Sequence, residues 1–275
     1  MFGWGRGKRR RALLETPLPD AQRARMHALA PLTAGLPSPL RERHEGVVQV
    51  LLAEKRFEGA GGLEVTEDMR LAIAGQAALL QLRAGADYYP GLHSIVIYPT
   101  AFTVAHERPD DDGLVHLDED ELSGESWGHG AVVLAWDDVR RESKRRDGYN
   151  VVLHEFAHQL DDQTGEADGT PVLRDGALAD RWPVAFQAAF EEHTRRLKRR
   201  REVLFDEDAA ESPTEFFATA VELFFEFPAE LRREYGAVYE ALAAWLELDP
   251  AGRQLVLAAL RGDHRARRVA PHADQ

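Results

Sequence analysis

Two histidines four residues apart, with a glutamate directly after the first, form the segment His154-Glu155-Phe156-Ala157-His158. Residues at positions i and i+4 of an α-helix share one face, with side chains about 6 Å apart. Two imidazoles on that face can bind one metal ion, and the carboxylate of Glu155 then lies beside the open side of the ion. This H-E-x-x-H spacing is typical of zinc hydrolases, in which the glutamate acts as the general base.

The flanking residues favour the helix that this spacing requires. Asn150 is a good N-cap, and residues 151–162 contain neither glycine nor proline. At 100° per residue, one side of the helix is apolar and the other is polar. The apolar side consists of Val152, Leu153, Phe156, Ala157 and Leu160, and the polar side of His154, Glu155, His158, Asp161 and Asp162. The sequence therefore predicts a helix that packs on the core through one face and carries a metal site on the other.

A catalytic zinc needs a third protein ligand and an open position for water. Thr164 lies six residues after His158, where one class of these enzymes has a third histidine, so that class is excluded. The remaining common ligand is a glutamate on a second helix, and the apolar segment 212–225 contains Glu215 and Glu222. These two residues are seven apart and share a face, and a carboxylate buried in so apolar a helix needs a partner such as a metal.

The residues alone leave the roles of these carboxylates open. Ser212 and Glu215, with Pro213 between them, have the spacing of a capping box, which explains Glu215 without any metal. Glu222, in the middle of the helix, is either the ligand instead or an acceptor for the second ring nitrogen of a ligand histidine. Asp161, near the end of the histidine helix, is either another such acceptor or an exposed carboxylate.

Composition limits the kind of protein that can carry this site. The chain has 275 residues, 44% hydrophobic and 29% charged, which are globular values that allow a substantial core. It contains no cysteine, so any metal ligands must be His, Asp or Glu. The net charge of −13 argues against binding to nucleic acid. No apolar run reaches the roughly 18 residues that span a bilayer, and the basic start lacks the apolar region of a signal peptide. We therefore expect a soluble, cytoplasmic protein without membrane contact.

The order of the expected elements favours an α+β fold, with few strands among many helices. We predict a flexible basic tail over residues 1–20, a single domain over residues 21–262 and a flexible tail over residues 263–275. Apolar periodicity and Gly/Pro positions predict the helices, which are residues 21–29, 40–55, 67–83, 151–162, 178–201, 212–225, 228–246 (one or two helices) and 252–261.

β-Branched residues predict strands over residues 94–98 and 131–136, and residues 102–104 are expected to extend the first into a hairpin. The acidic stretch 107–121 lacks the spacing of a calcium loop, and we predict a solvated loop there. The strand over residues 131–136 is expected inside the sheet. Its alternative place is the edge of a cleft, where an extended peptide can pair with it.

Four segments together resemble a known family. They are YPGLHSIVIYP (89–99), LSGESW (122–127), HEFAHQLD (154–161) and SPTEFFA (212–218). They are similar to motifs of the Mlc titration factor A family of zinc-dependent peptidases, and the likeness covers about residues 45–250. The C-terminal half is more distantly similar to the catalytic domain of anthrax lethal factor. The resemblance implies a zincin-like metallopeptidase fold, mostly helical with a small mixed sheet and with the H-E-x-x-H helix in the active site.

The resemblance also implies the site and its chemistry. His154, His158 and Glu215 would bind one catalytic Zn²⁺, a His₂Glu set of the gluzincin type that favours Glu215 over Glu222, and Glu155 would be the catalytic base. Zinc lowers the pKa of its bound water to about 7, and Glu155 moves the proton from that water to the leaving amine. The family also implies aminopeptidase cleavage of peptides and binding to the glucose repressor Mlc.

One position departs from the family pattern. Family members usually have a tyrosine seven residues before the ligand glutamate, where it can hydrogen-bond the oxyanion, and this chain has Asp208 there. Loss of one such donor typically costs about 10²–10³ in rate. Either another residue donates, with His129, Tyr235 and Tyr239 as unranked candidates, or the enzyme is slow. The alternative function is therefore a weakly active or inactive zinc-containing protein that binds a transcriptional regulator.

Overall fold

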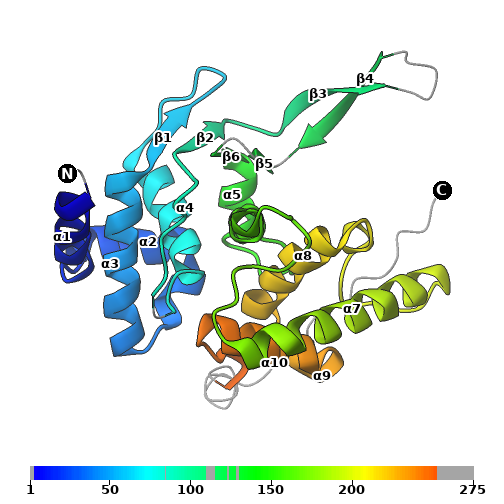
Figure 1. Cartoon of the computed structure of the whole chain (residues 1–275). Coiled ribbons are helices and arrows are strands. Elements are labelled where there is room, and N and C mark those ends of the chain that lie inside the picture. Colours follow the sequence, from blue (N-terminus) through cyan, green and yellow to red (C-terminus); the bar gives the residue numbers. More distant parts are fainter. Residues whose placement is uncertain (1–2, 84, 110–114, 123, 128–129, 253–275) are drawn as a thin grey trace.

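The computed structural model describes residues 3–83, 85–109, 115–122, 124–127 and 130–252 (Figure 1). Its helices are α1 (Gly3–Leu14), α2 (Asp20–Leu29), α3 (Ser38–Glu54), α4 (Glu67–Leu79), α5 (Trp136–Glu142), α6 (Val151–Asp161), α7 (Gly176–Lys198), α8 (Pro213–Glu226), α9 (Pro228–Glu234) and α10 (Gly236–Leu246). Its strands are β1 (Arg56–Gly59), β2 (Ser94–Tyr98), β3 (Phe102–Pro109), β4 (Val115–Leu122), β5 (Gly124–Trp127) and β6 (Ala131–Ala135). The predicted α+β class, mostly helical with a small mixed sheet, is confirmed. Among the described residues, none of the helices has the length and apolar character that a membrane span requires.

The main sheet has the strand order β1-β2-β6-β5. Strands β1, β2 and β6 are parallel, with Ser94 opposite Ala131, and β5 runs antiparallel to β6. The strand predicted over residues 131–136 is therefore inside the sheet, as expected, and the edge beside it is β5. Figure 1 shows α1–α4 gathered on one side of the molecule and α7–α10 on the other.

The acidic stretch differs from the prediction. Strand β3 pairs antiparallel with β4, with His106 opposite Asp118, so the loop predicted over residues 107–121 is wrong for residues 107–109 and 115–121, while residues 110–114 lie outside the described residues. The predicted pairing of residues 102–104 with residues 94–98 is also wrong, because β2 pairs with β1 and β6. A two-stranded ribbon is held by backbone hydrogen bonds and can face water on both sides, so an acidic composition does not exclude it.

The N-terminal segment also differs from the expected flexible tail, because residues 3–14 form helix α1 on the surface of α3. The guanidinium of Arg10 donates to both carboxylate oxygens of Glu54, with Nε 3.0 Å from Oε1. A Cβ at Gly46 would lie 2.4 Å from the carbonyl oxygen of Leu14, so this glycine allows the two helices to meet. The salt bridge and the close backbone contact thus hold α1 against α3, although the basic composition of this segment predicts a solvated tail. The tail predicted over residues 263–275, and all but Gly252 of the last predicted helix, lie outside the described residues.

Aromatic packing fixes α8, which carries both candidate glutamates. Phe216 stacks on Phe205 with ring centroids 4.4 Å apart. On the neighbouring position of α8, Phe217 contacts Trp182 of α7 and Trp245 of α10 at 5.9 and 5.8 Å. These rings belong to the hydrophobic core, which also contains the apolar face of α6. Helix α8 is therefore held from the side opposite α6, and its polar positions are directed at the histidine helix.

Candidate metal centre

Helix α6 begins where the sequence predicts. The side chain of Asn150 accepts a hydrogen bond from the backbone N–H of Leu153 at 3.1 Å, which confirms the predicted N-cap. Val152, Leu153, Phe156, Ala157 and Leu160 are all buried. Phe156 packs edge-on against Tyr89, with ring centroids 4.9 Å apart. The apolar face of the helix is thus anchored in the core, and this fixes the direction in which His154 and His158 project.

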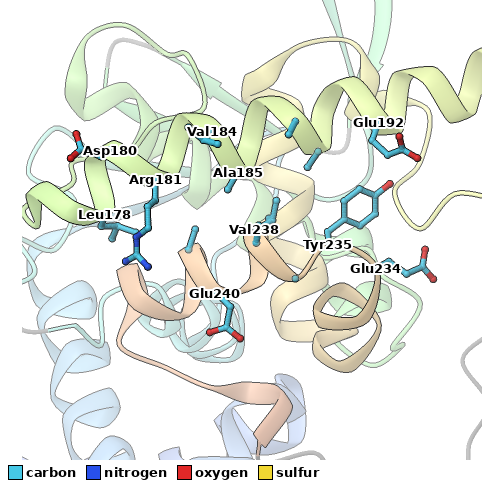
Figure 2. Close-up of a pocket in the computed structure, with 15 residues that line it drawn as sticks. Leu178, Asp180, Arg181, Val184, Ala185, Glu192, Glu234, Tyr235, Val238 and Glu240 are labelled. Carbon is cyan, nitrogen blue, oxygen red and sulfur yellow. The ribbon is translucent and has the colours of Figure 1, made fainter.

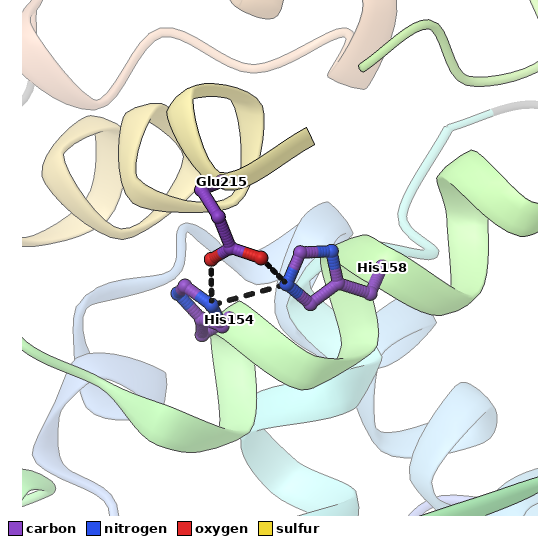
Figure 3. Close-up of side chains that lie close together, drawn as sticks. All are labelled: His154, His158 and Glu215. Carbon is purple, nitrogen blue, oxygen red and sulfur yellow. Dashed lines mark hydrogen bonds and ion pairs between the residues drawn. The ribbon is translucent and has the colours of Figure 1, made fainter. Parts of the chain in front are cut away.

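His154, His158 and Glu215 converge from two helices (Figure 3). The Nε2 atoms of the two imidazoles are 3.1 Å apart, and each also lies near the Glu215 carboxylate, at 3.1 Å from His154 and 3.4 Å from His158. Ligand atoms 2.0–2.1 Å from a tetrahedral zinc are roughly 3.3 Å from one another. The three side chains therefore already have the spacing of a cation site, and they could hold a metal ion without rearrangement.

Glu215 takes part in the cap of α8 through its backbone only. Its N–H donates to the hydroxyl of Ser212 at 3.1 Å, which is half of the capping box that the sequence suggests. Its carboxylate is directed at the two imidazoles instead of returning to the cap. The two roles that seemed to compete in the sequence are therefore compatible, because one belongs to the main chain and the other to the side chain.

Glu222 lies on the other side of His154. Its Oε1 is 2.8 Å from His154 Nδ1, and its Oε2 accepts a hydrogen bond from the backbone N–H of Asn150. Because a carboxylate only accepts, Nδ1 carries a hydrogen toward Glu222, and Nε2 is the nitrogen that would face a cation once its own proton is displaced. The structure thus places Glu222 in the second of its two predicted roles, as the partner of a histidine ring nitrogen.

Asp161 has neither of its predicted roles. Its side chain is fully buried and accepts hydrogen bonds from the backbone N–H groups of Gly169 and Thr170, each at 2.8 Å. Gly169 has a φ of +81°, and a Cβ there would lie 2.5 Å from the carbonyl oxygen of Pro213. Asp161 therefore ties the loop after α6 to the first residue of α8. This contact, which helps to set the distance between the two helices, depends on tertiary structure and has no local signal in the sequence.

Glu155 is buried beside the two histidines. Its side chain is 5% exposed, and its Oε2 atom has no hydrogen-bond partner among the described residues. Burial raises the pKa of Glu155 to about 7, while positive charge on His154 and His158 acts in the opposite direction. A carboxylate with a pKa near neutrality can both take and release a proton, which is the requirement for a general base that later acts as an acid.

The surroundings of the three converging side chains favour positive charge. Burial by itself lowers the pKa of His154, but the hydrogen bonds to Glu215 and Glu222 outweigh it, and the pKa is raised well above its ordinary value. Burial likewise acts to raise the pKa of Glu215, yet the hydrogen bonds from His154 and His158 leave it lowered. The cluster thus holds a proton tightly in the absence of any other cation, and a divalent ion would take the place of that proton.

Neither of the two described candidates for the missing tyrosine, Tyr235 and Tyr239, takes its place. Asp208 is exposed at the start of a short 3₁₀ turn. Tyr235 packs against Phe205 with ring centroids 4.9 Å apart, and the hydroxyl of Tyr239 is bonded to Asp249. His129 lies outside the described residues.

Tyr149 is a tyrosine that the sequence analysis does not name as a candidate donor. It directly precedes the N-cap of α6, and its side chain is 41% exposed. Partial burial raises its pKa to about 12, and the negative charges of Asp206, Asp208 and Glu222 act in the same direction. The phenol therefore stays protonated at neutral pH, directly before the N-cap of the histidine helix. Its place next to the N-cap of the histidine helix was the available signal.

The chain is similar to known proteins over nearly all of its described length. The family model for glucose-regulated metallo-peptidase M90 matches residues 4–246. The chain is 35% identical over 228 residues to Mlc titration factor A of Yersinia pestis, covering 81% of this chain and 83% of that protein. It is 34% identical over 244 residues to an uncharacterised protein of Synechocystis sp., covering 88% and 89% of the two chains. These matches confirm the resemblance inferred from the four motifs and include both helices of the metal centre, so the chain belongs to the glucose-regulated metallo-peptidase M90 family.

Proposed function

We propose that the protein is a zinc-dependent peptidase whose zinc ligands are His154, His158 and Glu215. The observation that carries this proposal is the mutual spacing of the three donor groups, 3.1–3.4 Å, on two helices that are fixed independently in the core. Two imidazoles and one carboxylate are a donor set suited to zinc, and the chain has no cysteine to offer a different one. The fold is then of the zincin type, and the site of the gluzincin type.

Glu155 is the general base in this proposal. A zinc ion held by the three ligands would lower the pKa of a water to about 7 and would polarise the scissile carbonyl. Glu155 is placed to accept a proton from the attacking water and to deliver it to the leaving amine. Its support is its burial beside the histidines and its pKa of about 7, which allow both transfers near neutral pH.

Tyr149 supplies the hydrogen-bond donor that Asp208 cannot provide. A phenol with a pKa of about 12 keeps its proton, and the nearby negative charges do not ionise it. Donation to the developing oxyanion is worth about two to three orders of magnitude in rate in other hydrolases. The support for this role is the place of Tyr149 directly before the N-cap of α6, together with the partial exposure of its side chain.

An extended peptide would pair with strand β5. Strand β6, the alternative that the sequence offers, has neighbours on both sides, whereas β5 is the last strand of the described sheet and contacts α6. Main-chain hydrogen bonds to an edge strand hold a substrate largely independently of its side chains. The cleavage is of the aminopeptidase type, as the family resemblance suggests.

A second proposed role is the binding of a repressor, and its support is similarity to named relatives. The relatives in Yersinia carry the name Mlc titration factor A, and we extend this to an Mlc-like transcriptional repressor as a partner of this chain. The competing function is a regulator-binding protein with little or no peptidase activity. Asp208 in place of the family tyrosine is the observation that favours it.

The variant Glu155→Gln tests the two functions together. It should keep bound zinc, lose hydrolysis of alanine p-nitroanilide, and leave capture of the repressor unchanged. Glu166→Gln, the same substitution on an exposed loop residue, is the matched control and should behave as the parent protein. Hydrolysis by Glu155→Gln at the parental rate would refute the general base. If the parent, loaded with zinc, hydrolyses no peptide but binds the repressor, the regulator-binding function is the correct one.

A further inference from the structure

Two features of the described structure lie outside the three converging side chains. One is an apolar groove of about 650 Å³ between α7 and α10, with Val184, Ala185 and Val238 among its lining residues (Figure 2). The groove is lined from α7, α10 and residues 234–235, which include none of the candidate ligands. The other is a network of buried polar side chains that begins on α4 and ends at His154, so this network is the feature that reaches the metal centre.

Gln76 is the first member of the network. It lies on α4 and is fully buried. Its amide NH₂ group donates to the hydroxyl of Ser143 at 2.9 Å and to the carbonyl oxygen of Ala72 at 3.2 Å. The Ser143 hydroxyl has a single hydrogen, which it donates to the carbonyl oxygen of Val139, so it accepts from Gln76. The amide oxygen of Gln76 is therefore directed the other way, where it accepts from Nδ2 of Asn150 at 2.8 Å.

Asn150 connects Gln76 to the histidine helix. Its side-chain Oδ1 accepts from the backbone N–H of Leu153 at 3.1 Å, so its NH₂ group faces Gln76. Its own backbone N–H donates to Oε2 of Glu222. The other carboxylate oxygen, Oε1, lies 2.8 Å from Nδ1 of His154. A single asparagine thus links the amide on α4 to the carboxylate that contacts a candidate ligand.

Burial makes each of these hydrogen bonds hard to replace. Gln76, Asn150 and Glu222 are at most 4% exposed, so water does not take the place of a lost partner. A buried polar group without a partner is unfavourable, and its neighbours move to regain a hydrogen bond. Loss of the Gln76 amide should therefore be transmitted to Asn150, and through Asn150 to the carboxylate of Glu222.

We propose that Gln76 is a positioning residue for His154. It fixes the side chain of Asn150 at the start of α6, and Asn150 and Glu222 together orient the imidazole so that Nε2 faces the cation position. The hydrogen bonds of Gln76 itself go to none of the candidate ligands. Because His154 is taken as a zinc ligand, this positioning role rests on the proposed function. The N-terminal helices, through α4, thus help to set the zinc affinity of the site.

The variant Gln76→Met tests this role, because methionine has a similar length and no amide. Zinc affinity, measured on the full-length protein by competition with a fluorescent chelator, should fall about three- to tenfold. Removal of a direct partner of a ligand typically costs about ten- to hundredfold. The loss in Gln76→Met should be smaller, because Asn150 and Glu222 lie between Gln76 and His154.

Gln81→Met is the matched control. Gln81 is also fully buried, and its amide oxygen accepts from the backbone N–H of Tyr88 at 3.0 Å. The same substitution there should destabilise the fold, yet it should change zinc affinity by no more than about twofold, because Gln81 is not part of the network.

The parent protein separates failure of this role from failure of the proposed function. If the parent binds zinc and Gln76→Met binds it as tightly, Gln76 does not position His154, and the zinc site stands. The same conclusion follows if Gln76→Met and Gln81→Met lose equal affinity. If the parent binds no zinc, the proposed function is refuted instead.

A double variant tests the route from Gln76 to His154. In Glu222→Gln the connection between Asn150 and His154 is already altered, so the addition of Gln76→Met should lower zinc affinity by less than about twofold further. Losses that multiply in the double variant would mean that Gln76 acts on the site by a route other than Glu222, and they would also overturn the proposal.

The hydrogen on Nδ1 of His154 gives a readout that does not depend on zinc binding, because its partner is Glu222. In full-length protein kept free of zinc, exchange of this hydrogen with water, followed by NMR, should be about threefold or more faster in Gln76→Met than in the parent. Gln81→Met should leave the exchange rate at the parental value. Equal rates in Gln76→Met and the parent would contradict the positioning role, whatever the zinc affinity.

Discussion

Substitution of Glu222 tests whether its carboxylate orients the proposed metal ligand His154. This carboxylate accepts hydrogen bonds both from His154 and from the backbone at the start of α6. Its Oε1 receives the Nδ1 hydrogen of His154 at 2.8 Å, and its Oε2 receives the backbone N–H at the N-cap of α6. Glutamine has one carbonyl oxygen and one amide NH₂ group. In Glu222→Gln one of the two donors must therefore face another donor, although the size and shape of the side chain hardly change.

The magnitude follows from which contact is lost. If the NH₂ group faces His154, the imidazole loses its orientation and its tautomer, and zinc affinity should fall about ten- to hundredfold, or roughly 1.4–2.8 kcal/mol. If it faces the N–H of Asn150, a buried donor is left without an acceptor. The metal-free protein should then lose about 1–3 kcal/mol of unfolding free energy. The glutamine amide can adopt only one of these two orientations at a time, and each orientation loses one contact. The loss of zinc-binding free energy and the loss of unfolding free energy should therefore sum to at least about 1 kcal/mol.

The assay is a competition for zinc between the protein and a fluorescent chelator, combined with chemical unfolding of the metal-free protein. Glu226→Gln is the matched control, since Glu226 lies one turn further along α8, is buried, and forms no hydrogen bond with His154. Burial raises its pKa to about 8, while Arg146 and the side chain of Asn150 act in the opposite direction. If Glu222→Gln keeps both zinc affinity and stability within twofold of the control, the reasoning about this site is refuted.

Further predictions concern the other residues of the structure. Tyr149→Phe should lower kcat about 10²–10³-fold with little change in zinc affinity, and an unchanged kcat in steady-state kinetics would exclude it as the oxyanion donor. Glu215→Gln should weaken zinc binding in the same chelator competition, whereas a local role in the helix cap alone would leave it unchanged. Burial lowers the pKa of His44 to about 4, against 6.5 in the unfolded chain, so the unfolded state binds the proton first. Unfolding free energy should therefore fall by up to about 3 kcal/mol as the pH drops from 6.5 to 4. His44→Gln should flatten this part of the stability curve measured by urea unfolding.

The features of the site that depend on local sequence were predictable. The N-cap at Asn150, the two faces of α6 and the spacing of His154 and His158 all follow from neighbouring residues and the helical period. Glu215 could be named as a candidate ligand because metal sites use few residue types. The capping-box spacing left its role open, and only the family motifs favoured the ligand role. The structure shows the reason, since the cap uses only its backbone N–H.

The features that depend on contacts between distant segments were not predictable. Asp161 looks like an exposed helix end in the sequence, yet the chain turns back so that the N–H groups of Gly169 and Thr170 meet it. Strand β4 and all but the start of β3 were missed for a related reason, because an acidic segment becomes a strand only when a second segment pairs with it. Charge likewise suggested a solvated N-terminus, whereas the partner of Arg10 is 44 residues away in sequence.

The balance of charges explains why this arrangement is suited to a cation. Glu155, Glu215 and Glu222 surround two imidazoles, and most of their surface is withdrawn from water. Such a set of carboxylates would repel itself strongly if the histidines stayed neutral. The hydrogen bonds to Glu215 and Glu222 raise the pKa of His154 well above its ordinary value, and a proton on this imidazole offsets part of that repulsion. A divalent ion relieves it further while leaving Glu155, the carboxylate that makes no hydrogen bond through Oε2, available for proton transfer. The features that make the cluster unfavourable without a cation are therefore those that would suit it to a metal ion.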